Sequence, residues 1–270
     1  MVLFRLVSAQ AWYSSVDRPI VITTLATGNY LERAQWCVNY LDRHAELAYL
    51  GAVGCNPCDK MELGHVGCYL VPAGMLDRSL GQPGNGCIQH GSWLPYLSVP
   101  DNAIIICIDG DVKMQRPFNE RERGWLADWR DGQIGIGPNE PKLGGDTMIN
   151  ELHRINPLQS HEKTAQLFGV EPGDPIGNAG CVVATRKTWI DLWLCYLKTW
   201  LETAPHFGHI AVQQWTLNLC INRHFERVVL PQTFHTHGHW GYPGPPFDGW
   251  GEDNTATVNR ETILFAHKTW

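Results

Sequence analysis

The apolar positions near the start of the chain follow a strand pattern, then a helical pattern, and then a strand pattern again. Residues 20–25 form a continuous β-prone run, Ile-Val-Ile-Thr-Thr-Leu, that ends before Gly28. Apolar side chains then recur at helical spacing over residues 31–41, and a second β-like run follows at 47–53. The order strand, turn, helix and strand predicts a βαβ unit, and therefore a parallel sheet that is covered by helices.

The clearest strand is predicted further along the chain. Residues 54–92 hold eight of the 27 glycines and four cysteines, and we expect a loop-rich surface with one short helix there. Residues 103–108, Ala-Ile-Ile-Ile-Cys-Ile, follow without polar alternation. Such a run is typical of a central strand that is buried on both faces, and it leads directly into Asp109 and Asp111.

The second half of the chain predicts helices with recognisable ends. Asn119 and Glu122 have the spacing of a capping box, and a helix over residues 160–168 should stop at Gly169. Large apolar side chains at i, i+3 and i+4 positions predict a core helix over residues 186–202.

We expect residues 231–254, rich in Gly, Pro and His, to be irregular, and a last strand at 262–265. We find no internal repeat and no convincing linker. Residues 1–270 are therefore predicted to form one α/β domain with a mixed, mostly parallel sheet flanked by helices.

Composition narrows the class of protein. A chain with 44% hydrophobic and 18% charged residues is too apolar for disorder, and its 270 residues suffice for one core. No apolar stretch approaches the roughly 18 residues of a spanning helix. Residues 1–11 resemble a signal peptide faintly, but Arg5 divides the apolar run, so we assign them to the fold.

The net charge argues against nucleic acid as a partner, and the cysteines indicate the cellular compartment. The net charge of −6, without a basic run, argues against tight binding of duplex nucleic acid. Nine cysteines, most of them single within apolar segments, are typical of reduced thiols. We therefore expect a cytoplasmic protein.

Asp109 and Asp111 are the first candidate for chemistry. They flank Gly110 at the end of the predicted central strand, and alternate residues of an extended segment project to the same side. Two hard oxygen ligands suit Mg²⁺ or Mn²⁺ bridging a diphosphate, at the strand end where α/β proteins bind ligands. An ordinary Asp-Gly turn is the alternative.

The sequence resembles metal-dependent nucleotide-sugar glycosyltransferases of the GT-A fold, specifically the retaining, galactosyltransferase- and glycogenin-like group called family 8. The resemblance rests on short blocks in the expected order: Ala26-Thr27-Gly28-Asn29-Tyr30, Ile108-Asp109-Gly110-Asp111-Val112, Asn178-Ala179-Gly180-Cys181-Val182-Val183, Gln213-Gln214-Trp215-Thr216-Leu217-Asn218, Leu230-Pro231 with Phe234-His235, and Phe265-Ala266-His267-Lys268-Thr269-Trp270.

The resemblance implies a hexosyltransferase that moves a sugar from a nucleotide diphosphate sugar, with UDP favoured, to an acceptor hydroxyl with retention. It implies a set of site residues. These are Asp109, Asp111 and His267 for Mn²⁺ or Mg²⁺; Ala26, Thr27, Asn29 and Tyr30 for the nucleoside; Asn178 and Gly180 for the sugar; Gln214 at the anomeric centre; and Lys268 for the diphosphate.

The chain departs from the family pattern at several positions. Thr27 stands where the family has an acid, and no arginine occurs in the segment 89–93 before the metal strand. Gln213 replaces the first acid of the family's Asp-Gln-Asp, which excludes a carboxylate nucleophile at that position. His267 and Lys268 are adjacent, whereas the family separates these two residue types by a short loop.

Three other functions stay open. An inverting GT-A transferase would use Glu252 or Asp253, in the block Trp250-Gly251-Glu252-Asp253, as its general base. A catalytically silent module would bind a nucleotide or glycan. Such a module would be expected to lack the family's acids at positions 27 and 213, where this chain has Thr27 and Gln213. A zinc hydrolase would need the histidine cluster described next, although the chain lacks a His-Glu-x-x-His frame.

Two further clusters can bind metal. His235, His237 and His239 present alternate imidazoles and are the first replacement if His267 does not reach the cation, with a polar loop as the alternative. Four soft ligands, Cys55, Cys58, His65 and Cys68, can form a structural Zn²⁺ site, with unrelated thiols as the alternative. The acceptor is not specified: a glycan, a protein, a metabolite and a modified DNA base all present hydroxyls.

Overall fold

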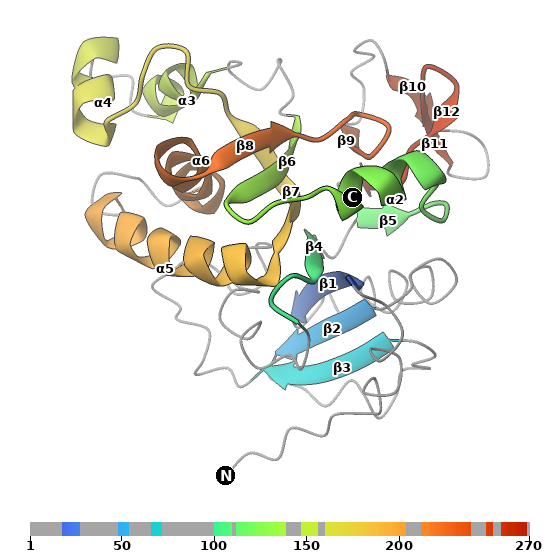
Figure 1. Ribbon diagram of the computed structural model, residues 1–270. Helices are drawn as coiled ribbons and strands as arrows, with labels where there is room; N and C mark the ends of the chain where they lie inside the picture. The colour runs from blue at the N-terminus through green and yellow to red at the C-terminus, as the bar shows by residue number, and fades with distance from the viewer. Residues whose placement is uncertain are drawn as a thin grey trace.

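The computed structural model describes residues 18–27, 48–53, 66–71, 100–109, 112–138, 147–155, 160–203, 212–238, 247–250 and 255–268. A seven-stranded sheet in the order β3-β2-β1-β4-β7-β6-β8 forms its centre (Figure 1). Its strands are β1 (Ile20–Thr27), β2 (Ala48–Val53), β3 (Val66–Val71), β4 (Ile104–Ile108), β6 (Gln133–Pro138), β7 (Gly177–Thr185) and β8 (Glu226–Val229).

The sheet is mixed and mostly parallel, as predicted. β1 pairs in parallel with β2 and β4, β2 with β3, and β6 with β8, whereas β7 runs antiparallel to both β4 and β6. The predicted pairing of the first two strands is confirmed, and the helix predicted between them, over residues 31–41, lies outside the described residues.

Helices and two small sheets surround this centre. The helices are α2 (Glu120–Ala127), α3 (Met148–Ile155), α4 (His161–Phe168), α5 (Arg186–Thr203) and α6 (Val212–His224). One small sheet has the order β5-β13-β9, from β5 (Val112–Met114), β13 (Phe265–Lys268) and β9 (His235–Gly238). The other consists of β10 (Phe247–Trp250), β11 (Ala256–Val258) and β12 (Glu261–Thr262).

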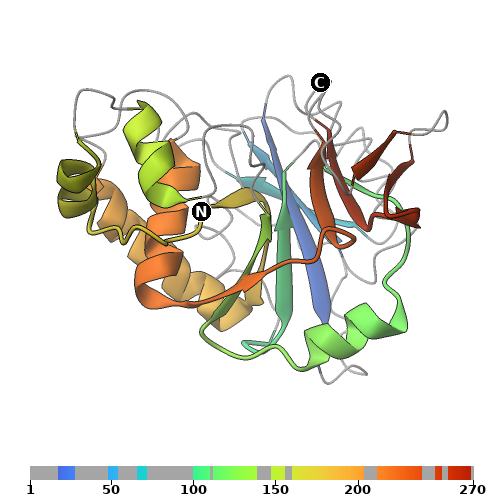
Figure 2. The ribbon, with the colours of Figure 1, turned by 90° about the horizontal axis from the view of Figure 1, so that it is seen from above.

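Two hydrophobic cores cover the two faces of the central sheet. Ile105 and Cys107 of β4 face the helices α5 and α6, where they pack with Trp189, Leu192, Tyr196, Leu217 and Cys220. Ile104, Ile106 and Ile108 face the other way, toward Phe118, Leu126, Trp129, Phe234 and Phe265. Figure 2 shows α5 and α6 on one side of the sheet and α2 with the small sheets on the other. β4 is therefore the predicted strand buried on both faces.

The predicted helix ends are confirmed at the level of single hydrogen bonds. The side chain of Asn119 accepts from the backbone N–H of Glu122, and the Glu122 carboxylate accepts from the N–H of Asn119, which completes the capping box of α2. Ser160 caps α4, which ends at Gly169 with a φ of 58°, in the left-handed region that glycine adopts at little cost. The core helix predicted over 186–202 is α5.

Three segments differ from the sequence-based prediction. Residues 66–71, expected in a loop-rich region, form the edge strand β3, and the segment expected to be irregular contains β9 and β10. The last strand is β13 at residues 265–268, three residues later than predicted. β9, His-Thr-His-Gly, has no apolar alternation, and its strand conformation comes from parallel pairing with β13, a contact distant in sequence.

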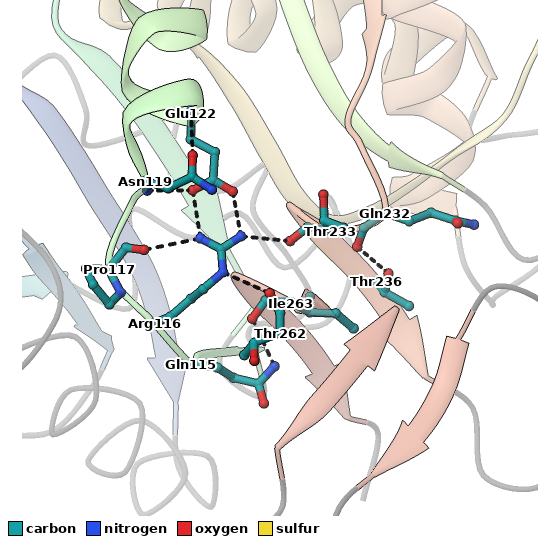
Figure 3. Close-up of polar contacts among 10 residues, drawn as sticks. All are labelled: Gln115, Arg116, Pro117, Asn119, Glu122, Gln232, Thr233, Thr236, Thr262 and Ile263. Atoms are coloured by element: carbon teal, nitrogen blue, oxygen red, sulfur yellow. Dashed lines mark hydrogen bonds and ion pairs between the residues drawn. The ribbon is translucent and has the colours of Figure 1, made fainter. Parts of the chain in front are cut away.

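A polar cluster joins α2 to the C-terminal strands (Figure 3). Arg116 follows β5 and makes a bidentate ion pair with Glu122, at 2.7 and 2.8 Å, while its Nε donates to the carbonyl of Thr262 at 2.8 Å. The neighbouring Gln115 accepts from the N–H of Ala256 at 2.7 Å and donates to the carbonyl of Ile263 at 3.1 Å. These bonds anchor the segment before β13 to the main body.

Replacing Arg116 with Ala should destabilise the protein strongly. The Arg116 and Glu122 side chains are only 22% and 10% exposed, so the variant leaves a largely buried carboxylate without its cation. We expect the free energy of unfolding, measured by urea denaturation, to fall by about 2–4 kcal/mol. The matched control is Arg130→Ala, whose pair with Glu226 is 71% and 58% exposed, and it should cost about 0–1 kcal/mol. Equal losses in the two variants would contradict the anchoring role.

Candidate active site

Several segments of the predicted site meet at one edge of the central sheet. β4 ends at Ile108, which is opposite Cys181 of the antiparallel β7, and the N–H of Asp109 donates to the carbonyl of Gly180 at 3.0 Å. In the parallel neighbour β1, Thr24 is opposite Ile108, so Ala26 and Thr27 lie just beyond the level of Asp109. The carboxyl ends of β1 and β4 and the start of β7 therefore share this edge.

Asp109 and His267 come together because the chain turns back after β4. The N–H of Val112 donates to the carbonyl of Asp109 at 3.0 Å, and β5 then pairs antiparallel with β13, with Val112 opposite His267. As a result, Nε2 of His267 lies 4.0 Å from Oδ2 of Asp109. The side chains are 7% and 27% exposed, so the carboxylate keeps an open side.

Two imidazoles sit against glycines of the main sheet. A Cβ atom at Gly180 would overlap with Nδ1 of His267, and one at Gly137 would overlap with Nδ1 of His235. The two rings are 5.9 Å apart between centroids, and the pairing of β6 with β7 shifts register between Ile136 and Gly137, beside His235. Because glycine has no Cβ atom, each imidazole can lie directly against the backbone of the main sheet. This close approach explains why glycine occupies both positions.

An amide network holds the N-terminal half of α6 against the start of β7. Oδ1 of Asn218 accepts from the N–H of Gly177 at 2.7 Å, and its Nδ2 donates to the carbonyl of the same residue at 2.9 Å. Oε1 of Gln214 accepts from the N–H of Ala179 at 3.4 Å, and Oδ1 of Asn178 accepts from the N–H of Gly180 at 2.8 Å. Gln214 and Asn178 are thereby brought to the edge that carries Asp109.

Arg227 is a member of this network that the sequence reasoning missed. It donates to Oδ1 of Asn218 at 2.6 Å, and burial lowers its pKa to about 10, so it stays charged at neutral pH. Nothing in the short segment around Arg227 indicated this role, because its partner belongs to the preceding helix and is recognisable only in the folded chain. Arg227 therefore supports Asn218, which joins α6 to the backbone of Gly177 at the start of β7.

The structure places the other predicted site residues only in part. The backbone is described at Ala26, Thr27, Lys268, Cys68 of β3 and His237 of β9, and their side chains lie outside the described part of the structure. Asp111, Asn29, Tyr30, His239, Glu252 and Asp253, and Cys55, Cys58 and His65 of the expected zinc site, lie outside the described residues. Within the described residues, no three His, Cys, Asp or Glu side chains form a metal-binding group.

Comparison with known proteins supplies a fold and no sequence family. Neither models of protein families nor curated protein sequences match the chain. Among solved structures, an active-site glutamine-to-glutamate mutant of LgtC matches with a TM-score of 0.60 and 14% identity, covering 93% of this chain and 88% of that chain. The chain has a GT-A fold.

A second structure gives the same result for the GT-A fold. The galactosyltransferase LgtC in complex with donor and acceptor sugar analogs matches with a TM-score of 0.56 and 12% identity, over 93% of this chain and 87% of that one. The GT-A fold predicted from the short sequence blocks is confirmed, and at this identity the likeness concerns the fold. No helix in the described part of the chain is long and apolar enough to cross a membrane.

The variant Gly180→Ala tests how closely the His267 imidazole packs against β7. The added methyl group overlaps with the imidazole and the Asn178 amide oxygen, so we expect the free energy of unfolding to fall by about 1–3 kcal/mol. Gly124→Ala is the matched control, since a Cβ there meets nothing within 4 Å and the residue lies within α2. It should raise the same quantity by about 0.5–1 kcal/mol. If urea denaturation gives an unchanged free energy of unfolding for Gly180→Ala, the His267 ring does not pack closely against this position.

Proposed function

We propose that this protein is a metal-dependent GT-A glycosyltransferase that moves a hexose from a nucleotide diphosphate sugar, with UDP favoured, to an acceptor hydroxyl. One observation carries the proposal. Asp109 and His267, from strands far apart in sequence, converge to 4.0 Å at the sheet edge that also holds Asn178 and Gln214. Galactosyl transfer by LgtC, which has the same fold, supports this choice of reaction class.

The pair of side chains suits a divalent cation. A separation of 4.0 Å is too long for a direct hydrogen bond, and a carboxylate oxygen beside an imidazole nitrogen is a donor set that would hold a divalent cation. Mn²⁺ accepts both carboxylate and imidazole ligands, and Mg²⁺ accepts the carboxylates. Asp111, two residues after Asp109, is the proposed third ligand. A cation held by these residues would supply positive charge against the leaving diphosphate.

The remaining residues bind and orient the donor. Asn178 and Gly180 position the sugar, and Gln214 presents an amide oxygen that stabilises positive charge at the anomeric carbon. Lys268, next to His267 on β13, adds a positive contact to the diphosphate. The nucleoside is bound by Ala26 and Thr27, at the carboxyl end of β1, and by Asn29 and Tyr30, which follow β1 in the sequence.

Retention is the stereochemistry that we propose. Gln213 stands where a carboxylate nucleophile would be needed for a double displacement, so the acceptor oxygen attacks from the face that the diphosphate leaves. The acceptor proton passes to the departing diphosphate, which balances the reaction without a protein base. Inversion with Glu252 or Asp253 as general base is the alternative.

A silent binding module is the second candidate function. Thr27 and Gln213 replace two acids of the family pattern, which a protein that binds nucleotides without transfer would tolerate. The zinc hydrolase has less support, because His235 is fully buried, packs against Gly137 and lies 5.9 Å from the His267 ring between centroids. A catalytic zinc ion needs a position open to water.

The central experiment measures nucleotide release from UDP-, GDP- and CDP-sugars with Mn²⁺. We expect Asp109→Asn to lower turnover at least about 100-fold, because the diphosphate loses part of its charge compensation. Asp191→Asn, which removes an exposed carboxylate on α5, is the matched control and should keep wild-type turnover. Circular dichroism and Tm verify the fold of both variants. Wild-type turnover in Asp109→Asn would overturn the metal assignment, and metal-dependent binding without any release would favour the silent module.

Gln214→Ala separates a role in the reaction from a role in the framework. The Gln214 hydrogen bond to the N–H of Ala179 is long, at 3.4 Å, so its loss should change Tm little. We expect kcat to fall by about 10²-fold while KM for the donor changes only a few-fold. The reason is that the interaction of the Gln214 amide oxygen with the anomeric carbon strengthens as positive charge develops there in the transition state. A parallel loss of Tm and activity would assign Gln214 to the framework alone.

A further inference from the structure

The outward face of α5 carries large apolar side chains that are open to solvent. Leu194 and Leu201 are 60% and 77% exposed, and Leu201 is the most exposed large hydrophobic side chain among the described residues. The opposite face of the helix enters the helix-side core through Trp189, Leu192, Tyr196 and Trp200. The neighbouring helix α6 packs beside α5 and does not cover these two leucines (Figure 1).

Four apolar residues form a row along this outward face, at intervals of four, three and four residues. They are Ile190, Leu194, Leu197 and Leu201. Ile190 and Leu197 are partly buried, whereas the other two side chains are exposed. Residues at this spacing lie on one stripe of an α-helix, and the same spacing lets two helices interleave their side chains in a coiled coil. This apolar row therefore has the pattern of one half of a helix–helix interface.

A row of charged residues runs beside the apolar row. Its members are Lys187, Asp191, Lys198 and Glu202, at intervals of four, seven and four residues. All four are exposed, and they alternate in sign. At about 3.6 residues per turn, all of them lie on the same side of the apolar row. Lys187 makes a long contact with Asp131, at 3.4 Å, but both side chains are more than half exposed, so this pair is weak. The charged row is therefore open to a partner.

The charged row is complementary to itself when it is read in reverse. If a second α5 lies antiparallel to the first, Lys187 of each copy meets Glu202 of the other. Asp191 of each copy likewise meets Lys198 of the other, so all four contacts join opposite charges. A two-fold axis perpendicular to both helices brings the same side of each helix together. The charged rows therefore face each other in an antiparallel pair and not in a parallel one.

The same alignment interleaves the apolar rows. The charge contacts fix the two-fold axis between residues 194 and 195. At this register Ile190 of one copy lies between Leu197 and Leu201 of the other, and Leu197 lies between Ile190 and Leu194. Side chains that alternate in this way pack as knobs into holes. The apolar spacing and the charge order thus select the same orientation and the same register.

We propose that this face of α5 binds the same face of a second copy of this chain, with the two helices antiparallel across a two-fold axis near Leu194. A lipid surface fits the face less well. Its two positive and two negative charges cancel, whereas helices that lie on anionic membranes carry an excess of Lys and Arg. The proposal is independent of sugar transfer, because none of these residues belongs to the site at the sheet edge.

Sedimentation equilibrium of the full chain measures the association directly. We expect the mean mass to rise with protein concentration from the 30.4 kDa of one chain toward twice that value. A wild-type protein that keeps the mass of one chain up to a concentration of about 1 mM would overturn the proposal. Binding of such a monomer to vesicles of anionic lipid would assign the face to a membrane instead.

Charge reversal tests the antiparallel pairing. Lys198→Glu places like charges opposite Asp191 at both symmetric contacts, and Asp191→Lys does the same opposite Lys198. We expect each variant alone to associate at least about tenfold more weakly than the wild type. An equimolar mixture of the two should associate within a few-fold of the wild type, because every contact in the mixed pair again joins opposite charges.

The matched control for charge reversal is Lys163→Glu, which changes the net charge equally at an exposed position of α4. It should associate as the wild type does, and circular dichroism and Tm verify the fold of all three variants. Wild-type association by the single variants Lys198→Glu and Asp191→Lys, or no recovery in their mixture, would overturn the antiparallel pairing.

Leu194→Ser tests the apolar row. The side chain is 60% exposed, so the variant should keep the Tm of the single chain. We expect its association to weaken at least about tenfold, because the two-fold axis places both copies of Leu194 in the interface. Val229→Ser is the matched control, since it removes a side chain that is 61% exposed on β8, and it should associate as the wild type does. Equal association of Leu194→Ser and the wild type would place the contact on another surface and overturn the proposal.

Discussion

The burial of β4 on both faces is the constraint on which the site depends. Alternate side chains of this strand enter two different cores, one with α5 and α6 and one with α2 and the sheet of β5, β13 and β9. A shift of register by one residue would exchange these cores, so the pairing with β1 and β7 is strongly determined. The position of Asp109 at the sheet edge follows from this register.

The second requirement is close approach between the small sheet and the main sheet. His267 and His235 are accommodated because Gly180 and Gly137 have no Cβ. Protein interiors are too densely packed to accept an extra methyl group at such contacts without displacement of a neighbour. Polar bonds from Arg116 and Gln115 hold the segment before β13 in the orientation that this packing needs.

Much of this arrangement was predictable from local patterns. β1, β2, β4, the capped helix α2, the glycine stop of α4 and the core helix α5 all carry signals that act over a few residues: apolar runs, helical periodicity and capping hydrogen bonds. Asp109 could be placed at a strand end for the same reason, since a continuous apolar run ends directly before it. The mixed, mostly parallel α/β sheet followed from these elements and from the short sequence blocks.

The sequence by itself therefore determined the individual elements and the carboxylate at the end of β4, because those depend on neighbouring residues. Tertiary structure decided the rest. β9 is a strand because β13 pairs with it, and Arg227 supports the site because Asn218 receives its hydrogen bond. The meeting of Asp109 with His267 likewise arises from the pairing of β5 with β13, between segments about 150 residues apart whose contact depends on the packing of the whole molecule.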